Sequence, residues 1–435
     1  MAVPRTYHLV TLGCPKNDVD SDHLERILTG GELLPVLQPG DADAIIVNTC
    51  GFIEQSQEQS MEAVRQLAAA KKDGQQLIVA GCMTQLYGRQ VKEETPQVDH
   101  IFGVGQWQEV AKLLSVDVDA IYDIPESNVR VAGPSAYLKI SDGCDAPCTF
   151  CVIPKIKGGL RSAPAGLLVR EAQRLVEAGA RELVLVGQDT TAWGEDLGMS
   201  VGSGLPGLLQ MLSEAVGPEV WLRLMYAYPS RVSPALIETM AGLPNVIPYL
   251  DVPLQHGSEG VLRRMKRPSN VAKVHGFIDE LRRAMPDIVL RTSFIAGFPG
   301  ETDEEFRELL SFAKEIQFDH AGCFTYSLQQ WTGAFDMSDQ VADEVKHERR
   351  DRFMRQQRKI AAKRARRFVG KTLDLLVEGV GEDEDGDPVV AGRTYREAPE
   401  VDGLVFARGA AEPGARVRVQ IDETADYDLF GTVVG

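Results

Sequence analysis

Short apolar runs alternate with longer polar, helix-like stretches over the first 130 or so residues. The strand-like runs lie at residues 7–12, 44–47 and 77–80. Such alternation is typical of a parallel sheet whose strands are joined by crossover helices. We therefore expect an α/β fold in which residues 1–125 form a doubly wound parallel sheet.

A second series of apolar runs begins at residue 136. Amphipathic segments such as 167–178 and 271–283 separate six strand-like runs, at 137–140, 183–186, 221–225, 246–250, 288–295 and 320–326. Six βα units predict a partial (β/α)6 barrel over residues 136–342, with reactive side chains on the loops that follow the strands. Residues 126–135 contain Pro and Ser and are expected to be a linker.

The last part of the chain changes pattern twice. Residues 343–368 predict a long connecting helix, and its basic charges are interrupted by acidic and apolar residues, which disfavours a nucleic-acid patch. Residues 369–435 contain short β-like runs, such as those at 373–377, 404–407 and 416–421, between Gly, Pro and Asp turns. This pattern predicts a small, OB-like β-barrel.

Three thiols follow the first strand of the second series. Cys144, Cys148 and Cys151 have C-x-x-x-C-x-x-C spacing, and neither a fourth Cys nor a nearby His completes the set. A closed zinc site and an electron-carrying cubane each need four ligands. Three thiolates on a 4Fe-4S cluster leave one iron open to a reactant. A partial zinc knuckle or three buried thiols is the alternative, which this specific spacing disfavours.

Three more cysteines follow the first three predicted strands. Cys14, Cys50 and Cys82 each come within three residues of a strand end. Because ligands bind at the carboxyl ends of strands in a doubly wound sheet, these thiols can converge. We favour a second three-thiolate cluster over a coincidence of buried cysteines. The seventh cysteine, Cys323, lies inside a predicted strand and is expected to be a core residue.

Composition limits the setting and the partners. The 435 residues are 44% hydrophobic and 25% charged, as in ordinary soluble proteins. The N-terminus has no signal-like apolar run, and no stretch is long enough to span a bilayer, so we expect no membrane partner and a cytoplasmic location. Thiols stay reduced there, which favours metal ligation over disulfides.

The charge is strongly acidic. The formal net charge is -17, and residues 369–435 hold six Lys and Arg against fifteen Asp and Glu. An acidic chain is a poor binder of phosphate backbones, so tRNA is an unfavoured partner. The acidity suits a basic protein partner, although it would equally serve solubility.

Six further side chains are candidate cofactor contacts, because they flank the thiol loop or lie on or after barrel strands: Phe150, Gln188, Arg223, Gln255, His256 and Arg291. His256 could instead be a structural histidine. The two arginines could meet the carboxylate of a cofactor or simply pair with a barrel acid.

With these motifs in view, the chain resembles the radical S-adenosylmethionine methylthiotransferases from end to end. The three-part order of spaced N-terminal cysteines, thiol-bearing barrel and β module carries the resemblance. Six segments look like the branch that modifies a ribosomal protein: residues 12–21, 48–53, 80–82, 141–145, 223–226 and 392–403.

The resemblance implies a TRAM module at residues 369–435, two 4Fe-4S clusters and S-adenosylmethionine as cofactors. The cluster on Cys144, Cys148 and Cys151 would generate a radical that removes hydrogen from the β-carbon of an aspartate of small-subunit ribosomal protein S-twelve. The cluster on the N-terminal thiols would supply the sulfur, which a second S-adenosylmethionine methylates. An electron donor, such as a flavodoxin or ferredoxin, and a sulfur donor are also implied. The protein would orient these cofactors while they perform the chemistry.

Two alternatives stay open at this point. One is methylthiolation of tRNA adenosine by the same machinery, and the other is a non-catalytic iron-sulfur protein that binds ribosomes. Two segments also depart from the family pattern. Residues 328–333 lack the expected acidic loop, and Lys157 stands where Arg is commoner, so charge is kept without bidentate geometry.

Overall fold

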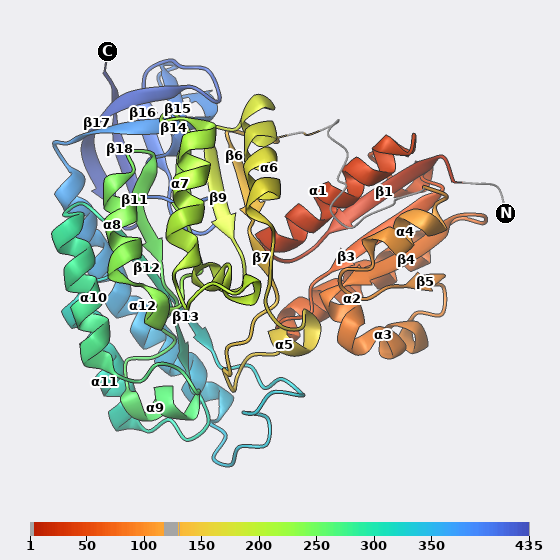
Figure 1. Cartoon of the computed structure of the whole chain (residues 1–435), viewed down its shortest axis with the longest axis horizontal. Helices are drawn as coiled ribbons and strands as arrows, with labels where there is room; N and C mark the ends of the chain where they lie inside the picture. The colour runs from red at the N-terminus through yellow and green to blue at the C-terminus, as the bar shows by residue number, and fades with distance from the viewer. Residues whose placement is uncertain (1–3, 117–128, 130, 435) are drawn as a thin grey trace.

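Three structural units lie side by side in the computed structural model, which describes residues 4–116, 129 and 131–434 (Figure 1). An N-terminal α/β unit lies beside a central barrel, and the C-terminal β unit packs against the barrel at the end distant from helix α9. Residues 117–128 and 130 lie outside the described ranges, and they include part of the predicted linker at 126–135. The linker and the domain limits therefore stay predictions.

The N-terminal sheet has five parallel strands in the order β2-β1-β3-β4-β5. They are β1 (Thr6–Thr11), β2 (Leu34–Pro35), β3 (Ala44–Thr49), β4 (Gln76–Gly81) and β5 (His100–Ile101). The three expected strands are confirmed. The other two have two residues each and are too short to create a hydrophobic pattern.

Helices cover both faces of this sheet, which confirms the doubly wound prediction. Helices α1 (Pro15–Gly30) and α4 (Trp107–Leu113) share one apolar core with the sheet. Helices α2 (Glu54–Ala70) and α3 (Cys82–Glu94) share the other. Every residue of β3 and β4 is buried, as expected for central parallel strands that are covered on both faces.

The central unit is an open barrel of six parallel strands in the order β13-β12-β11-β10-β9-β6. The strands are β6 (Ser135–Lys139), β9 (Glu182–Val186), β10 (Trp221–Leu224), β11 (Val246–Asp251), β12 (Val289–Ala296) and β13 (His320–Thr325). All six predicted strands are confirmed to within two residues. A two-stranded antiparallel pair, β7 (Ser141–Asp142) and β8 (Arg161–Ser162), flanks the thiol loop.

Helices surround the barrel and fix its strands. The α-helices are α5 (Ile153–Ile156), α6 (Ala165–Glu177), α7 (Gly204–Val216), α8 (Pro234–Gly242), α9 (Glu259–Arg264), α10 (Val271–Ala284), α11 (Asp303–Ile316) and α12 (Asp343–Ala365). Short 3-10 turns are η1 (Pro39–Asp41) in the N-terminal unit, and η2 (Thr190–Ala192), η3 (Glu195–Leu197), η4 (Pro229–Arg231) and η5 (Arg366–Phe368) in the later part of the chain. A capping box between Thr302 and Glu305 starts α11 directly after the β12 turn.

The C-terminal unit is a closed barrel in the order β14-β15-β16-β18-β17. Its strands are β14 (Thr372–Glu382), β15 (Pro388–Arg393), β16 (Val405–Arg408), β17 (Arg416–Ala425) and β18 (Asp428–Val433). Side chains of this unit share one apolar core with Val184, Ile247 and Tyr249 of the central barrel strands. The C-terminal unit therefore covers part of the central barrel.

No helix within the described ranges combines the length and the apolarity that a bilayer crossing requires.

Candidate functional site

The first thiol triad lies along one edge of the N-terminal sheet. Cys14 precedes α1 at the end of β1, Cys50 follows β3, and Cys82 begins α3 directly after β4. Strands β1, β3 and β4 are parallel neighbours, so their carboxyl ends bring these loops together. Burial raises the pKa of Cys82 to about 12; the ammonium group of Lys157 acts against this, and the adjacent Cys50 and Cys14 add to it.

Close packing holds the three loops of this triad. Gly13 has φ +109°, and a Cβ there would lie 2.6 Å from Cβ and 2.9 Å from Sγ of Cys50. Asn17 donates to the carbonyl oxygens of Leu12 at 2.7 Å and Thr49 at 3.3 Å, and its side-chain oxygen lies 3.8 Å from Sγ of Cys82. Glycine at position 13 and the Asn17 amide therefore shape the triad.

The second triad occupies the loop between β7 and α5 of the central barrel. Ala146 donates its backbone N–H to Sγ of Cys144 at 3.4 Å, and Cys151 N–H donates to the carbonyl of Cys148 at 3.2 Å. Burial raises the pKa of Cys151 to about 12, with Cys148 and Cys144 contributing. Thr149 binds the loop to the end of α9 by donating from its hydroxyl to the Arg264 carbonyl at 2.9 Å.

The donor sets fit iron-sulfur clusters. All seven cysteines are free thiols, and six of them form two separate triads. In the described part of the chain, no three Cys, His, Asp or Glu side chains are grouped as ligands of a single metal ion. A cubane binds each thiolate through a different iron, and soft thiolates are the donors that such clusters use.

Cationic and aromatic side chains accompany the barrel triad. Nη1 of Arg267 lies 3.7 Å from Sγ of Cys148, and its guanidinium lies 4.1 Å from the ring centroid of Tyr228. Arg231 pairs with Asp189 at 3.1 Å and with Glu195 at 2.7 Å. Sequence reasoning missed the two arginines and Tyr228, because they lie in loops without a motif. Their positions in the sequence, shortly after strand β10 for Tyr228 and Arg231 and after helix α9 for Arg267, could have pointed to them.

Three of the six candidate cofactor contacts are partly exposed near strand ends or the thiol loop. Gln188 follows β9, and Gln255 follows β11 with φ +74°. Phe150 packs against the apolar cluster that contains Phe298 and Tyr326. Their roles toward a cofactor stay predictions.

His256 and the two arginines are engaged within the protein. Nδ1 of His256 accepts the N–H of Ser258 at 2.9 Å, and its Nε2 lies 3.5 Å from the Glu301 carboxylate in a fully buried site. This arrangement agrees with the structural alternative for His256.

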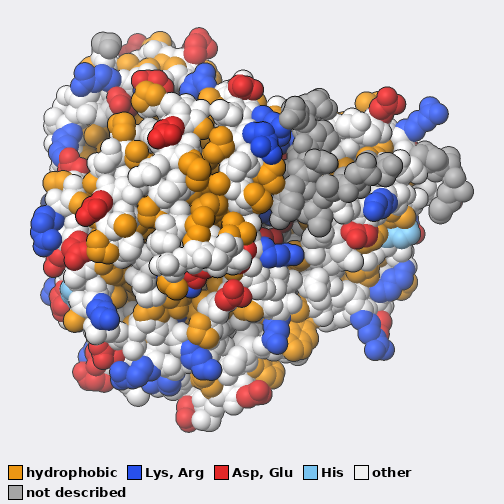
Figure 2. Space-filling model, viewed as in Figure 1, with side chains coloured by type: hydrophobic (Ala, Val, Ile, Leu, Met, Phe, Trp, Pro, Cys, Tyr) orange, Lys and Arg blue, Asp and Glu red, His pale blue; other side chains and the backbone are white. Residues whose placement is uncertain are grey.

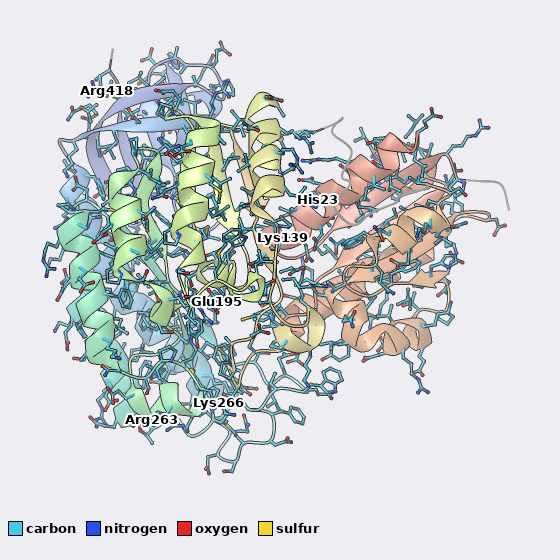
Figure 3. All side chains as sticks on the ribbon, in the orientation of Figure 1. His23, Lys139, Glu195, Arg263, Lys266 and Arg418 are labelled. Carbon is cyan, nitrogen blue, oxygen red and sulfur yellow. The ribbon has the colours of Figure 1, made fainter. Side chains whose placement is uncertain are left out.

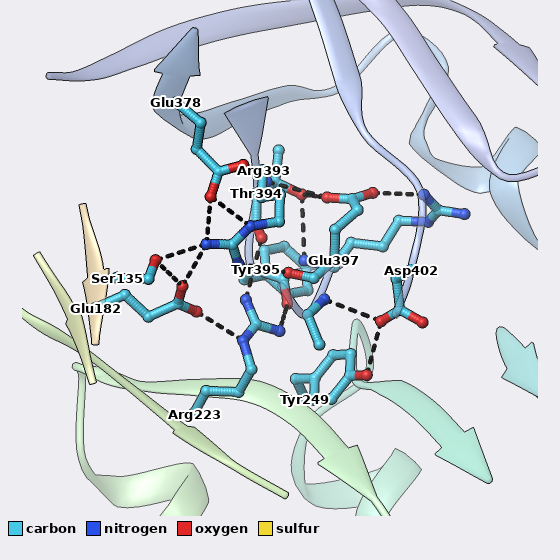
Figure 4. Close-up of polar contacts among 12 residues, drawn as sticks. Ser135, Glu182, Arg223, Tyr249, Glu378, Arg393, Thr394, Tyr395, Glu397 and Asp402 are labelled. Atoms are coloured by element: carbon cyan, nitrogen blue, oxygen red, sulfur yellow. Dashed lines mark hydrogen bonds and ion pairs between the residues drawn. The ribbon is translucent and has the colours of Figure 1, made fainter. Parts of the chain in front are cut away.

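Arg223 and Arg291 each pair with an acidic residue of the barrel, which was one of the two roles considered for them from the sequence. Arg223 is buried, pairs with Glu182 at 2.6 Å and donates to the carbonyl of Tyr395 in the C-terminal unit at 2.9 Å (Figure 4). Arg291 pairs with Asp251 at 2.8 Å. Cys323 is buried in the apolar core around the barrel, which confirms its expected role.

Four charged residues join the N-terminal unit to the barrel between the two triads. Nζ of Lys157 lies 3.3 Å from Asp20 and 3.2 Å from Asp142, and Lys139 also pairs with Asp20. Figure 3 shows Lys139 beside His23 where α1 meets the barrel. Burial opposes ionisation of Asp20, but the two ammonium groups outweigh it and lower the pKa of Asp20 to about 2.

The lysine at position 157 therefore serves two separate carboxylates. A single ammonium group can bridge Asp20 and Asp142, whereas the bidentate geometry of arginine suits one carboxylate. Lysine at position 157, where arginine is commoner in the family, thus keeps a charged contact between the two units. Its ammonium group is also close enough to Cys82 to oppose the rise that burial causes in the pKa of that thiol.

Comparisons with known proteins follow the same three units. Residues 6–103 match the uncharacterized protein family UPF0004, residues 138–313 match the radical SAM superfamily, and residues 369–434 match the TRAM domain. A ribosomal protein uS12 methylthiotransferase RimO of Herpetosiphon aurantiacus is 43% identical over 98% of this chain and 100% of its own length. This chain belongs to the RimO family.

Other RimO relatives agree in extent. The protein of Anaeromyxobacter sp. (strain Fw109-5) is 43% identical, covering 100% of this chain and 94% of its own. The protein of Thermotoga petrophila is 41% identical over 97% of this chain and 98% of its own. The resemblance stated from the sequence is thereby confirmed, and the chain is a radical S-adenosylmethionine methylthiotransferase that uses this cofactor and two 4Fe-4S clusters.

Solved structures support the fold. The radical S-adenosylmethionine methyltransferase TsrM of Kitasatospora setae matches with a TM-score of 0.58 at 14% identity, covering 76% of this chain and 77% of its own. The radical enzyme OxsB matches with a TM-score of 0.53, also at 14% identity, over 82% of this chain and 56% of its own. Both confirm the arrangement of the radical SAM fold.

Proposed function

We propose that this chain methylthiolates the β-carbon of an aspartate of ribosomal protein uS12. Cys144, Cys148 and Cys151 would hold the cluster that activates S-adenosylmethionine, and Cys14, Cys50 and Cys82 would hold the cluster that supplies sulfur. When bound, these groups supply radical chemistry, sulfur and the methyl group. The full-length likeness to proteins named uS12 methylthiotransferases supports the substrate.

The observation that carries this proposal is the pairing of two three-thiol loops across one junction. Helix α5 follows the barrel triad directly, and its Ile156 packs against Cys82 of the other triad in a small apolar cluster. Lys157 continues that contact with its ion pairs to Asp20 and Asp142. Three thiolates leave the fourth iron of each 4Fe-4S cluster free to bind a reactant. The two clusters would therefore offer two open iron positions on either side of this junction.

The side chains around the barrel triad have separate tasks. Arg267 places a charged donor at the Cys148 sulfur, which favours the reduced, more negative state of an iron-sulfur group. The Arg231 pairs with Asp189 and Glu195 fix the loops after β9 and β10. Phe150, Gln188 and Gln255 are the residues that we propose to contact S-adenosylmethionine.

A tRNA substrate is the second candidate, and the charge distribution does not favour it. Acidic and basic side chains are interspersed over the face seen in Figure 2. The formal net charge is -17. A basic field is what phosphate backbones require, whereas an acidic protein suits a basic partner and gains mainly in encounter rate.

Further partners follow from the proposed chemistry. The reaction needs an electron donor, such as a flavodoxin or ferredoxin, and a sulfur donor. We propose that all of these meet the enzyme in the cytoplasm, where its ribosomal substrate is made.

The test presents uS12 and bulk tRNA separately to the anaerobically reconstituted, reduced enzyme and measures product masses. We expect a methylthio increment on uS12 that is lost in Cys14→Ala and in Cys148→Ala. Cys323→Ala removes the one cysteine outside the triads and should retain the increment. A methylthio increment on tRNA alone would show that tRNA, and not uS12, is the substrate. No increment on either substrate would refute both.

A further inference from the structure

Lys16 connects the sulfur-bearing triad to the reactive end of the barrel. It follows Cys14 by two residues, in the first turn of α1. Its Nζ lies 3.7 Å from the ring centroid of Tyr226, which comes two residues after the end of β10. Reactive groups of such barrels lie on the loops after the strands, so this ammonium group faces the region between the two triads.

The backbone holds Tyr226 firmly in this position. Its φ is +60°, a conformation that a tyrosine adopts only when its surroundings enforce it. Tyr226 N–H donates to Asp251 at 3.1 Å, and its carbonyl accepts the N–H of Thr190 at 3.1 Å. The aromatic face under Lys16 is therefore a fixed part of the barrel end.

Lys16 is a buried cation with an aromatic partner but no anionic one. Its exposed fraction is 6%. The other two lysines that are buried to this degree have carboxylate partners, Asp20 and Asp142 for Lys157 and Asp343 for Lys346. Within the described residues, no carboxylate lies at ion-pair distance from Lys16. A ring face compensates a buried ammonium group only in part, so the site favours an added anion.

We propose that Lys16 binds the side-chain carboxylate of the substrate aspartate. This inference rests on the proposed function and names the residue that orients the substrate. The carboxylate is bonded to the β-carbon, so an ion pair with Lys16 would place the reacting carbon beside the Cys14 triad. Asparagine at the same substrate position would keep the shape and lose the charge.

The surroundings of Lys16 suit an aspartate carried on a basic segment. Tyr226 and Tyr137 of β6 pack against the same apolar cluster. Burial raises the pKa of the Tyr137 hydroxyl, and Glu400 of the C-terminal unit is close enough for its carboxylate to raise that pKa further. Glu400 in turn lies near Asp18 of α1. Residues of all three units thus lie close to Tyr226, whose ring Lys16 covers, and two of them, Glu400 and Asp18, are acidic. Basic residues beside the substrate aspartate would pair with these acids.

The experiment measures binding without turnover. Reconstituted enzyme with S-adenosylmethionine and no reductant is titrated with fluorescently labelled uS12, and with uS12 in which the aspartate identified by product mass is changed to asparagine. The wild-type enzyme should bind the aspartate form about tenfold more tightly, as expected for a charge-assisted contact. In Lys16→Met, which keeps the stem over Tyr226, the ratio should fall to about one.

Three controls separate this role from a structural one. Lys112→Met removes the same charge from an exposed position of the same unit and should keep the tenfold ratio. Lys16→Arg should restore part of it. Iron content should be equal in wild type and Lys16→Met, and the unfolding midpoint of the variant should be no lower than that of the wild type. A Lys16→Met enzyme that still prefers aspartate, or that loses affinity for both forms equally, would overturn the inference. Failure of the wild-type enzyme to modify uS12 would instead refute the proposed function.

Discussion

Lys157 and Asp20 form an ion pair, 3.3 Å apart, across the junction between the barrel triad and the N-terminal unit. Both side chains are nearly inaccessible, with exposed fractions of 2% for Lys157 and 9% for Asp20. The neighbouring residue, Ile156, packs against Cys82, so this ion pair lies at the place where the loops of the two triads meet.

Lys157→Met should weaken that junction. Removal of one partner leaves Asp20 buried with one cation fewer, at a cost of about 3 kcal/mol or more in the free energy of unfolding. Denaturant unfolding measures this loss. Lys155→Met removes an exposed charge two residues earlier and should cost less than about 0.5 kcal/mol. Equal effects of the two changes would contradict a role for the buried pair.

Gly13→Ala should abolish cluster binding at the N-terminal triad and leave the barrel triad loaded. The new Cβ would lie 2.6 Å from the Cys50 Cβ, a separation that requires the ligand loop to move. Iron analysis of the reconstituted protein should show about half of the wild-type content.

Gly74→Ala is the matched control for that change. Gly74 belongs to the same unit and has φ +87°, but a Cβ there would meet no atom within 4 Å. Both substitutions carry the backbone cost of a positive φ, about 1 kcal/mol. Full iron content in Gly74→Ala with half in Gly13→Ala would attribute the loss to the Cys50 contact. Loss in both would attribute it to backbone strain.

Glu182→Gln should loosen the C-terminal unit from the barrel. Glu182 is fully buried between Arg223 and Arg393, and the latter belongs to β15 (Figure 4). Its neutralisation leaves two buried guanidinium groups without a full counter-charge, at about 3 to 5 kcal/mol. Limited proteolysis should release a fragment of the C-terminal unit faster than in the wild type. Glu177→Gln, at the exposed end of α6, should behave like the wild type.

Acid should destabilise the same interface in a defined window. Burial opposes ionisation of Glu182, but Arg223 and Arg393 outweigh it and lower its pKa from 4.5 to about 2. The unfolded chain therefore binds more protons between these values. The stabilisation is present above about pH 4.5 and is lost as the pH falls toward 2, by about 3 kcal/mol in total.

Urea unfolding at about pH 5 and about pH 3 tests this sign. The wild-type protein should lose more stability between the two values than Glu182→Gln, since the variant has no carboxyl to protonate there. Identical losses in the two proteins would show that Glu182 does not titrate in this window.

Arg267→Gln should make the barrel cluster harder to reduce. Nη1 of Arg267 lies 3.7 Å from Sγ of Cys148, and donors to a ligand sulfur raise the potential of such clusters. Loss of about 1.4 kcal/mol corresponds to about 60 mV for one electron. An electron paramagnetic resonance titration measures the midpoint potential. Arg263→Gln, an exposed change on α9, is the control and should leave it unchanged.

Much of this architecture was predictable from hydrophobic pattern alone. The strands that carry the thiols are continuous apolar runs, such as β3 and β4, because both faces of the sheet are covered. The spacing of Cys144, Cys148 and Cys151 is local, so the sequence displays it directly. Strands β15 and β18 were not predicted, since Gly392 and Gly431 interrupt their patterns and admit close backbone contacts with other strands.

The partners of charged side chains were not predictable in the same way. Arg223 and Glu182 are 41 residues apart, and Lys157 and Asp20 are 137 apart. Nothing in the local pattern distinguishes these charges from the exposed ones around them. Lys16 lies in the segment 12–21, which attracted attention because of Cys14. Its contact with Tyr226 becomes visible only in the folded structure, where the end of β10 lies beside the start of α1.

The distance along the chain between Glu182 and Arg393, 211 residues, has a consequence for biosynthesis. The ligands of the N-terminal triad have all been translated by residue 82, and the barrel triad by residue 151. The arginine that completes the Glu182 pairs is translated only near the end of the chain. While the chain is being made, both sets of thiols thus exist before the C-terminal unit can cover its part of the barrel. Both sets of cysteine ligands are therefore complete before the Glu182–Arg393 ion pair, which joins the C-terminal unit to the barrel, can form.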